Sequence, residues 1–156
     1  MRVAFAADHA GAAMKDELIR RLGAAGIEHE LIDLGGDGLD PNDDYPDFAQ
    51  RLGLAIRDGR ADRGILICGS GVGASVAANK MKGIRSAVCH DTYSAHQGVE
   101  HDDMNVLTLG ARVIGPESAK TVVHAWLESE FAGGASTRKV AKIDRLEERL
   151  SSNGRG

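Results

Sequence analysis

The sequence holds little of what marks secreted, disulfide-stapled domains. It has 2 cysteines and 3 prolines in 156 residues, and aromatic residues make up only 4% of it. A small secreted domain usually carries more cysteines, so we interpret Cys68 and Cys89 as reduced thiols of a cytoplasmic protein. The first six residues already have the pattern of a strand, and no signal segment is expected there. With so few aromatics, the core is expected to be aliphatic.

Long apolar runs and basic runs are also lacking. No apolar stretch approaches the about 20 residues that a membrane span requires. The net charge is −4, and the 19 basic residues are interleaved with 23 acidic ones. Proteins that bind nucleic acids or membrane surfaces usually present a positively charged surface, so neither is expected as a partner. A single phosphate group needs only a few cations and is compatible with this charge.

In the sequence, short apolar runs alternate regularly with segments in which apolar residues recur at helical spacing. Strands are predicted at residues 3–6, 29–34, 64–68, 86–89 and 105–109, with amphipathic helices between them. Such alternation is typical of parallel strands joined by right-handed crossovers. We therefore predict a single Rossmann-like α/β domain over residues 1–150, with a five-stranded parallel sheet and helices on both faces. Residues 151–156 are predicted to be a flexible C-terminal tail.

A last helix is predicted beyond the sheet, after a Gly-Gly turn. Val140, Ile143, Leu146 and Leu150 give it an apolar stripe. The stripe can pack on its own domain, or it can pack on a second subunit. We expect the second arrangement, in which the C-terminal helix packs at a subunit interface.

Candidate functional residues follow directly after the predicted strands. In open parallel sheets, ligands bind beyond the carboxyl ends of the strands. The residues found there are Asp8 and His9, the acidic loop that ends in Asp44 and Tyr45, Cys68, His90, Asp91 and Arg112. One edge of the predicted sheet therefore gathers a thiol, histidines, carboxylates and an arginine.

Cys68 is followed at once by a glycine loop and a helix. The positive end of a helix and its free N–H groups favour a thiolate, which can act as a base or a nucleophile. The alternative is a small buried hydrophobe that ends a strand. The loop Gly69-Ser70-Gly71-Val72-Gly73 leaves N–H groups free for a phosphate or an oxyanion. With Ala74 it also fits the dinucleotide pattern G-x-G-x-x-G/A, which normally follows the first strand of its unit rather than the third.

The histidine spacing does not favour a metal site. His101, Asp102 and Asp103 precede the last predicted strand, with His90 and His96 as conceivable co-ligands. His96 and His101 are five residues apart, which places them off a common helical face. No pair of histidines has the helical spacing of zinc ligands, so we expect no metal.

Taken together, these residues resemble those of the ribose-5-phosphate isomerase B and galactose-6-phosphate isomerase family. The matching segments, in order along nearly the whole chain, are Ala7-Asp8-His9-Ala10-Gly11, Asp44-Tyr45-Pro46, residues 65–73, Ala77-Ala78-Asn79-Lys80, Gly83-Ile84-Arg85, residues 100–107 and Gly110-Ala111-Arg112-Val113. The resemblance implies a Rossmann-like fold and a homodimer or dimer of dimers whose sites combine residues of two subunits. It also implies that neither cofactor nor metal is used.

The resemblance further implies aldose–ketose isomerisation of a sugar phosphate. Cys68 would take the C2 proton of the open-chain aldose and return one to C1 through a cis-enediolate, and His101 would open the furanose ring. The oxyanion would be stabilised by Ser70 and by the N–H groups of Gly69, Gly71 and Gly73. The remaining contacts would be Asp8 and Tyr45 to sugar hydroxyls, and His9 and Arg112 to the phosphate.

Two segments depart from the family pattern. Asp102 stands where the family often has Asn, and an acceptor-only carboxylate would select other hydroxyls than an amide. Family members usually carry Arg-His-x-x-Arg after the Gly-Gly turn, whereas this sequence has Ala135 and Lys139 at the two arginine positions. Arg138 and Lys139 would then hold the phosphate as point charges rather than as a bidentate clamp.

Three functions are open at this point. The first is an isomerase, with ribose 5-phosphate and ribulose 5-phosphate as the default pair, or with another four- to six-carbon aldose phosphate. The second is a non-catalytic module that binds a sugar phosphate or nucleotide through loop 69–73 and does not require Cys68. The third is a dinucleotide oxidoreductase, which would show a nicotinamide-dependent absorbance change.

Overall fold

The computed structural model describes residues 1–153, with side chains up to residue 150. Strands and helices alternate along most of this length. The strands are β1 (Arg2–Ala7), β2 (Glu30–Asp33), β3 (Arg63–Cys68), β4 (Ser86–Val88) and β5 (Val106–Gly110), and the helices are α1 (Ala12–Ala24), α2 (Tyr45–Arg57), α3 (Val72–Ala78), α4 (Thr92–Asp102), α5 (Pro116–Leu127) and α6 (Ala135–Asn153). Each predicted strand is confirmed to within one residue at either end.

The five strands form one sheet in the order β2-β1-β3-β5-β4, and every pair is parallel. β2 lies on one side of β1, and β3 lies on the other. The chain therefore changes direction across the sheet between β1 and β3. In open α/β sheets this is the place where a crevice opens beyond the strand ends, because the loops after the two strands diverge to opposite faces. The predicted parallel sheet is confirmed, and Asp8 and Cys68 follow the two strands at this point.

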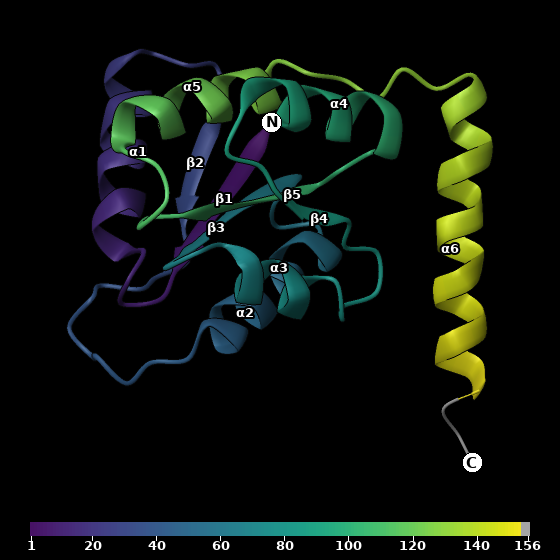
Figure 1. Ribbon diagram of the computed structural model, residues 1–156, viewed down its shortest axis with the longest axis horizontal. Helices are drawn as coiled ribbons and strands as arrows, with labels where there is room; N and C mark the ends of the chain where they lie inside the picture. The colour runs from purple at the N-terminus through teal and green to yellow at the C-terminus, as the bar shows by residue number, and fades with distance from the viewer. Residues whose placement is uncertain (154–156) are drawn as a thin grey trace.

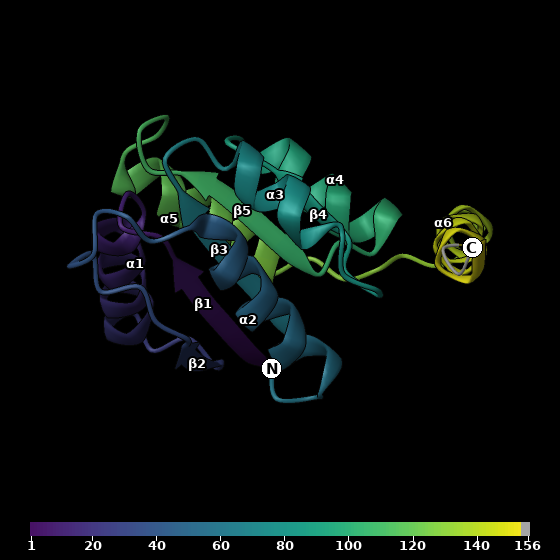
Figure 2. The same cartoon turned by 90° about the horizontal axis from the view of Figure 1, so that it is seen from below.

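Helices cover both faces of the sheet, as predicted (Figures 1 and 2). On one face, α1, α4 and α5 pack against strand residues such as Phe5, Ile65 and Leu107. On the other face, α2 and α3 pack against Ala4 and Leu66. Successive strand residues thus pack into opposite halves of the core, which is why the central strands are apolar at nearly every position after their first residue, with Thr108 of β5 as an exception. No helix within residues 1–153 is both long and apolar enough to cross a membrane.

Helix α6 stands apart from the rest of the domain (Figures 1 and 2). Val140 near its start is buried, but the exposed fractions of Ile143, Leu146 and Leu150 rise from 42% to 50% and 72%. The Glu147 carboxylate accepts the N–H of Gly83 at 3.0 Å, which ties the helix to the loop after α3. The apolar stripe predicted from the sequence is therefore uncovered in the single chain. The helix runs to Asn153, and the rest of the predicted tail, 154–156, lies outside the described residues.

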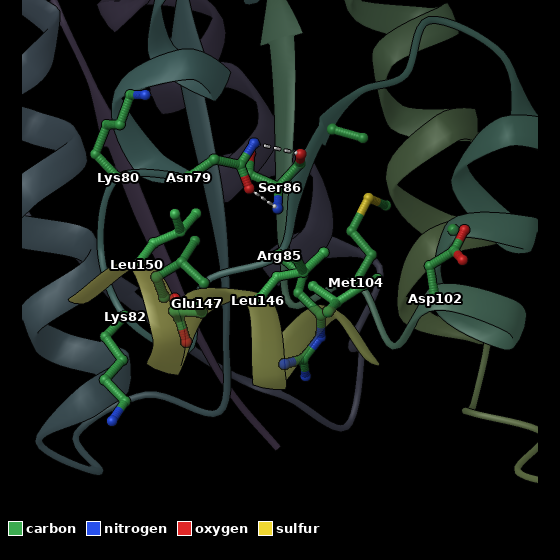
Figure 3. Close-up of a pocket in the computed structure, with 14 residues that line it drawn as sticks. Asn79, Lys80, Lys82, Arg85, Ser86, Asp102, Met104, Leu146, Glu147 and Leu150 are labelled. Carbon is green, nitrogen blue, oxygen red and sulfur yellow. Dashed lines mark hydrogen bonds between the residues drawn. The ribbon is translucent and has the colours of Figure 1, made fainter. Parts of the chain in front are cut away.

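A groove of about 750 Å³ separates α6 from the open edge of the sheet (Figure 3). Leu146 and Leu150 of α6 line one wall, and Met104 lines the other. At its rim, the Asn79 carboxamide accepts the backbone N–H of Ser86 and donates to its carbonyl, both at 2.8 Å. Ser86 begins β4, the edge strand, so this side chain bonds the edge that has no neighbouring strand.

Candidate active site

Cys68 is the last residue of β3, and the structure places it at the centre of the candidate site. Its register partner on β5 is Gly110, and its side chain is only 4% exposed. The Sγ atom accepts the backbone N–H of Gly71 at 3.1 Å. An N–H donor at this position stabilises negative charge on the sulfur, which a proton-abstracting thiol needs.

The turn after Cys68 depends on the conformation of Gly71. Its φ of +81° is in the left-handed region, and a Cβ there would lie 3.0 Å from the carbonyl carbon of Leu109. The turn leads directly into α3, whose first intrahelical bond runs from the N–H of Ser75 to the carbonyl of Gly71. The N–H groups of Gly73 and Ala74 precede that bond and are available to an anion. The Gly71 N–H, predicted to face an oxyanion, instead bonds the thiol.

A pocket of about 330 Å³ opens beside the thiol. Its lining consists of Asp8, Tyr45, Cys68, Gly69, Ser70, Gly73, Arg112 and Val113, so all but one of its residues were predicted from the sequence. Asp8 follows β1, is 6% exposed, and accepts the N–H of Gly11 on one oxygen, Oδ1, at 3.0 Å. This bond fixes the carboxylate in place and leaves the other oxygen for a ligand hydroxyl.

Tyr45 reaches the pocket because it is the first residue of α2. The helix begins there, with Pro46 in its first turn, where a missing N–H costs nothing. A Cβ on Gly73 would lie 2.7 Å from Cζ of the Tyr45 ring. Only glycine at position 73 lets the phenol pack this closely on the turn, which places its hydroxyl-bearing end next to the anion-binding N–H groups.

Arg112 is held over the glycine turn from the β5 side. Its backbone N–H donates to the carbonyl of Gly69 at 3.0 Å, and the N–H of Ala111 donates to that of Cys68 at 2.9 Å. The guanidinium Nη1 lies 3.6 Å from where a Cβ on Gly69 would be. His90, which follows β4, accepts the N–H of Gly110 on Nε2 at 2.9 Å and so steadies the start of this loop. The result is a cation beside the free N–H groups.

His9 lies next to Asp8 and is held by Asp43. Its Nδ1 is 2.6 Å from Oδ1 of Asp43, and its backbone N–H donates to the same oxygen at 2.9 Å. The hydrogen bond and charge of Asp43, with a smaller contribution from Asp8, raise the pKa of His9 above its ordinary value. His9 therefore carries positive charge to higher pH than a free histidine does.

Six predicted residues do not line this pocket in the single chain, and two of them, His9 and Gly71, lie beside it through their contacts with Asp43 and Cys68. The other four lie farther away. His101 and Asp102 lie in the last turn of α4, and Arg138 and Lys139 lie in the first turns of α6. Helix α4 runs back to the amino end of β5, where Val106 pairs with Gly64, whereas Cys68 pairs at the carboxyl end. The length of β3 alone separates the two levels by ~13 Å. Asp102 instead lines the groove beside α6 (Figure 3).

The structure also gives findings that the sequence left open. Within residues 1–153, no group of three or more His, Cys, Asp and Glu side chains is arranged to hold a metal ion.

Asp43 and Val113 are additional residues at the site. The only signal for Asp43 was its place in the acidic loop 35–44, which holds four aspartates with no feature that singles out one of them.

Known proteins match this chain in sequence and in fold. The family model of the ribose/galactose isomerases matches residues 3–143. The chain is 44% identical over 148 residues to ribose-5-phosphate isomerase B of Escherichia coli, covering 95% of this chain and 97% of that protein. It is 45% identical over 147 residues to D-erythrulose-4-phosphate isomerase of Pectobacterium atrosepticum, covering 94% and 95% of the two chains.

Solved structures give the same result. Ribose-5-phosphate isomerase B of Clostridium thermocellum matches with a TM-score of 0.89 and 42% identity, over 96% of this chain and 99% of that one. The chain therefore belongs to the ribose/galactose isomerase family and is a sugar-phosphate isomerase.

Proposed function

We propose that this enzyme interconverts an aldose phosphate and its ketose with Cys68 as the base, and that ribose 5-phosphate and ribulose 5-phosphate are its default pair. One observation carries the proposal. The Cys68 thiol accepts the Gly71 N–H and lines a pocket that also presents a carboxylate, a phenol and a guanidinium. A proton shuttle between adjacent carbons needs a base, oxyanion donors and groups that orient hydroxyls. Membership of an isomerase family favours this function over the non-catalytic module and the oxidoreductase.

The chemical step follows from this arrangement. The Cys68 thiolate removes the C2 proton of the open-chain aldose, and the electron pair of the broken C–H bond forms a C1=C2 double bond. The carbonyl electrons move to O1, which becomes the oxyanion of a cis-enediolate, stabilised by the N–H groups of Gly73 and Ala74 and by the Ser70 hydroxyl. The thiol then returns the proton to C1, and the O2 proton transfers to O1, which leaves the carbonyl at C2.

A second copy of the chain completes the site in this proposal. Ring opening is assigned to His101 and further contacts to Asp102, Arg138 and Lys139, all of which lie away from Cys68 in the same chain. The apolar stripe on α6 and the groove beside it support a homodimer or dimer of dimers, because both leave apolar surface uncovered.

Two free thiols support the expected cytoplasmic location.

The choice of sugar needs its own test. The relatives named for a five-carbon and a four-carbon sugar phosphate are 44% and 45% identical to this chain, so overall similarity does not separate them. Isomerisation of four-, five- and six-carbon aldose phosphates should be measured by coupled assay, with Cys68→Ala in parallel. We expect turnover of ribose 5-phosphate by the wild type, and binding without turnover by the variant. Unchanged turnover in the variant would remove Cys68 from the mechanism.

The shared site is tested by mixing two inactive variants. Cys68→Ala lacks the base, and His101→Ala lacks the ring-opening group. If each site takes these residues from different copies, hybrid dimers contain one site with both residues intact. Denaturing and refolding an equal mixture should restore about a quarter of the wild-type activity, because half of the dimers are hybrids with one intact site each. A mixture as inactive as its parents would place both residues in sites of one chain.

A further inference from the structure

The loop between β2 and α2 is joined to the end of β1 through one carboxylate. Oδ1 of Asp43 is 2.9 Å from the backbone nitrogen of His9 and 2.6 Å from Nδ1 of its ring. A single oxygen that accepts both donors fixes the backbone and the ring of the same residue. The Asp43 side chain is only 15% exposed and that of His9 is 33% exposed, so the pair is shielded from solvent on the Asp43 side.

The bond between Nδ1 and Asp43 also determines which nitrogen of the His9 ring can bind a ligand. Because Nδ1 is bonded to Asp43, Nε2 is the nitrogen left for a ligand, and no partner for it is found among the described residues. Two carboxylates act on the ring, Asp43 from the loop and, more weakly, Asp8 after β1. In the pocket beside Cys68 the cation is Arg112, and the other titratable groups are Asp8, Tyr45 and Cys68. On its other side Asp43 lines a second pocket, whose charged residues are Lys15, Asp16, Asp33, Asp37, Asp40 and Arg51.

We propose that Asp43 is a positioning residue that keeps His9 an oriented imidazolium, so that Nε2–H binds the phosphate dianion of the substrate and does so in a pH-dependent way. The proposal rests on the proposed function for the identity of the anion. It goes beyond that function because it assigns a role to Asp43 and a pH range to binding. The raised pKa of His9, caused mainly by its hydrogen bond to Asp43, agrees with this role.

The direction of the pH effect follows from the charge. Below its pKa, His9 is cationic and attracts the phosphate. As the pH rises through the pKa, the charge is lost and the KM of a phosphorylated substrate increases. Without the Asp43 carboxylate the pKa of His9 falls, so the increase in KM begins at a lower pH. The rate constant of the chemical step does not depend on His9 and is expected to change little.

The first experiment measures the titration of His9 directly, without substrate. The ring signals of the six histidines are followed by NMR against pH, and His9→Gln identifies the His9 signal. Asp43→Asn keeps the size and an acceptor oxygen but removes the charge. Asp40→Asn is the matched control, because Asp40 lies in the same loop and its carboxylate bonds the N–H of Asn42 rather than His9. We expect the midpoint of His9 to fall in Asp43→Asn and to stay unchanged in Asp40→Asn.

The second experiment measures anion binding and kinetics in the same proteins. Inorganic phosphate is titrated at pH 6, 7 and 8, and KM and kcat are measured over the same range with ribose 5-phosphate. At pH 7 to 8 Asp43→Asn should raise KM about tenfold, the effect of losing a charge-assisted hydrogen bond, with kcat within twofold of the wild type. Phosphate affinity should weaken in parallel, and Asp40→Asn should match the wild type.

The outcomes separate this proposal from the proposed function. An unchanged His9 midpoint in Asp43→Asn overturns the role of Asp43. A lowered midpoint with an unchanged phosphate affinity also overturns the proposal, because it places the anion away from His9. If no sugar phosphate is turned over by the wild type, the proposed function fails, but the midpoint and the phosphate titration still decide whether Asp43 prepares His9 to bind an anion.

Discussion

Cys68 is the last residue of β3 and Cys89 directly follows β4 in the same sheet, and the two thiols differ mainly in their surroundings. Exposure does not distinguish them, since they are 4% and 3% exposed. Cys68 is followed by a glycine turn that gives its sulfur an N–H donor at 3.1 Å, and it borders a pocket. Cys89 packs into the core formed with α1, α4 and α5, and burial together with the Asp91 charge raises its pKa from 9.0 to about 11.

The difference shows that the residues after a strand, more than the strand itself, decide what a terminal thiol can do. After β3 the chain turns through the left-handed Gly71, whose N–H points back to the sulfur. After Cys89 the next residues are His90 and Asp91. The first bonds the neighbouring strand through Gly110, and the second caps α4 by accepting the N–H of Ser94 at 2.7 Å. No donor is left there to stabilise a thiolate.

The largest expected effect comes from removing each sulfur in turn. Cys68→Ala should lower kcat by about 10³-fold or more, since it deletes the proposed base. Cys89→Ala should keep kcat within twofold and lose about 1 kcal/mol of unfolding free energy through the small cavity it creates. Steady-state assays and urea unfolding of both variants give the result. A similar loss of kcat in both would mean that the two thiols are not functionally distinct.

A smaller effect is expected in the pH dependence of stability, and only from Cys89. Folding raises the pKa of this thiol, so the folded protein favours its neutral form. The contribution of the neutral thiol to the unfolding free energy is therefore complete below pH 9 and is lost as the pH rises toward 11. Between pH 8 and 10.5 the wild type should lose about 2 kcal/mol more unfolding free energy than Cys89→Ala does. Urea unfolding at the two pH values measures this. Equal losses in the two proteins would show that the Cys89 thiol titrates normally in the fold.

The smallest effect should come from the glycine that donates to Cys68. Gly71→Ala places a side chain at φ +81° and 3.0 Å from Leu109, which should shift the N–H away from the sulfur and lower kcat about tenfold. Gly83→Ala is the matched control, with φ +79° and open space around the new Cβ. Both should cost about 1–2 kcal/mol of stability. If Gly83→Ala slowed the reaction as much, the loss would reflect strain rather than the donor.

Much of the fold could be predicted from the sequence because local patterns agree with the tertiary structure. The apolar runs that end at Ala7 and Cys68 are strands buried on both faces, and their periodicity requires no knowledge of distant contacts. The placement of Asp8, Tyr45, Cys68 and Arg112 around one pocket followed from the rule that parallel strands end at the same edge. The position of each of these residues is set by the strand or helix to which it belongs or which it adjoins.

The rest depends on contacts that no local pattern encodes. His101 and Asp102 precede the last strand, as expected, and so lie at the amino end of β5, away from Cys68. Only contacts between copies of the chain, which no local pattern encodes, could bring them to a Cys68 site. Asp43 was one of four aspartates in its loop, and only the folded path of residues 35–44 brings its carboxylate to His9. The start of α2 at Tyr45 depends likewise on the Asp44 backbone, which is extended just before the helix.

The Asn79 side chain has a consequence for the behaviour of the protein at high concentration. A parallel sheet of this kind ends in an open strand whose outward N–H and C=O groups can recruit a strand from another molecule and start aggregation. β4 is only three residues long, and the carboxamide of Asn79 already occupies both outward groups of Ser86. One amide side chain thus takes the place that a foreign strand would need at Ser86, and hinders strand addition at this edge of the sheet while leaving the groove beside α6 free.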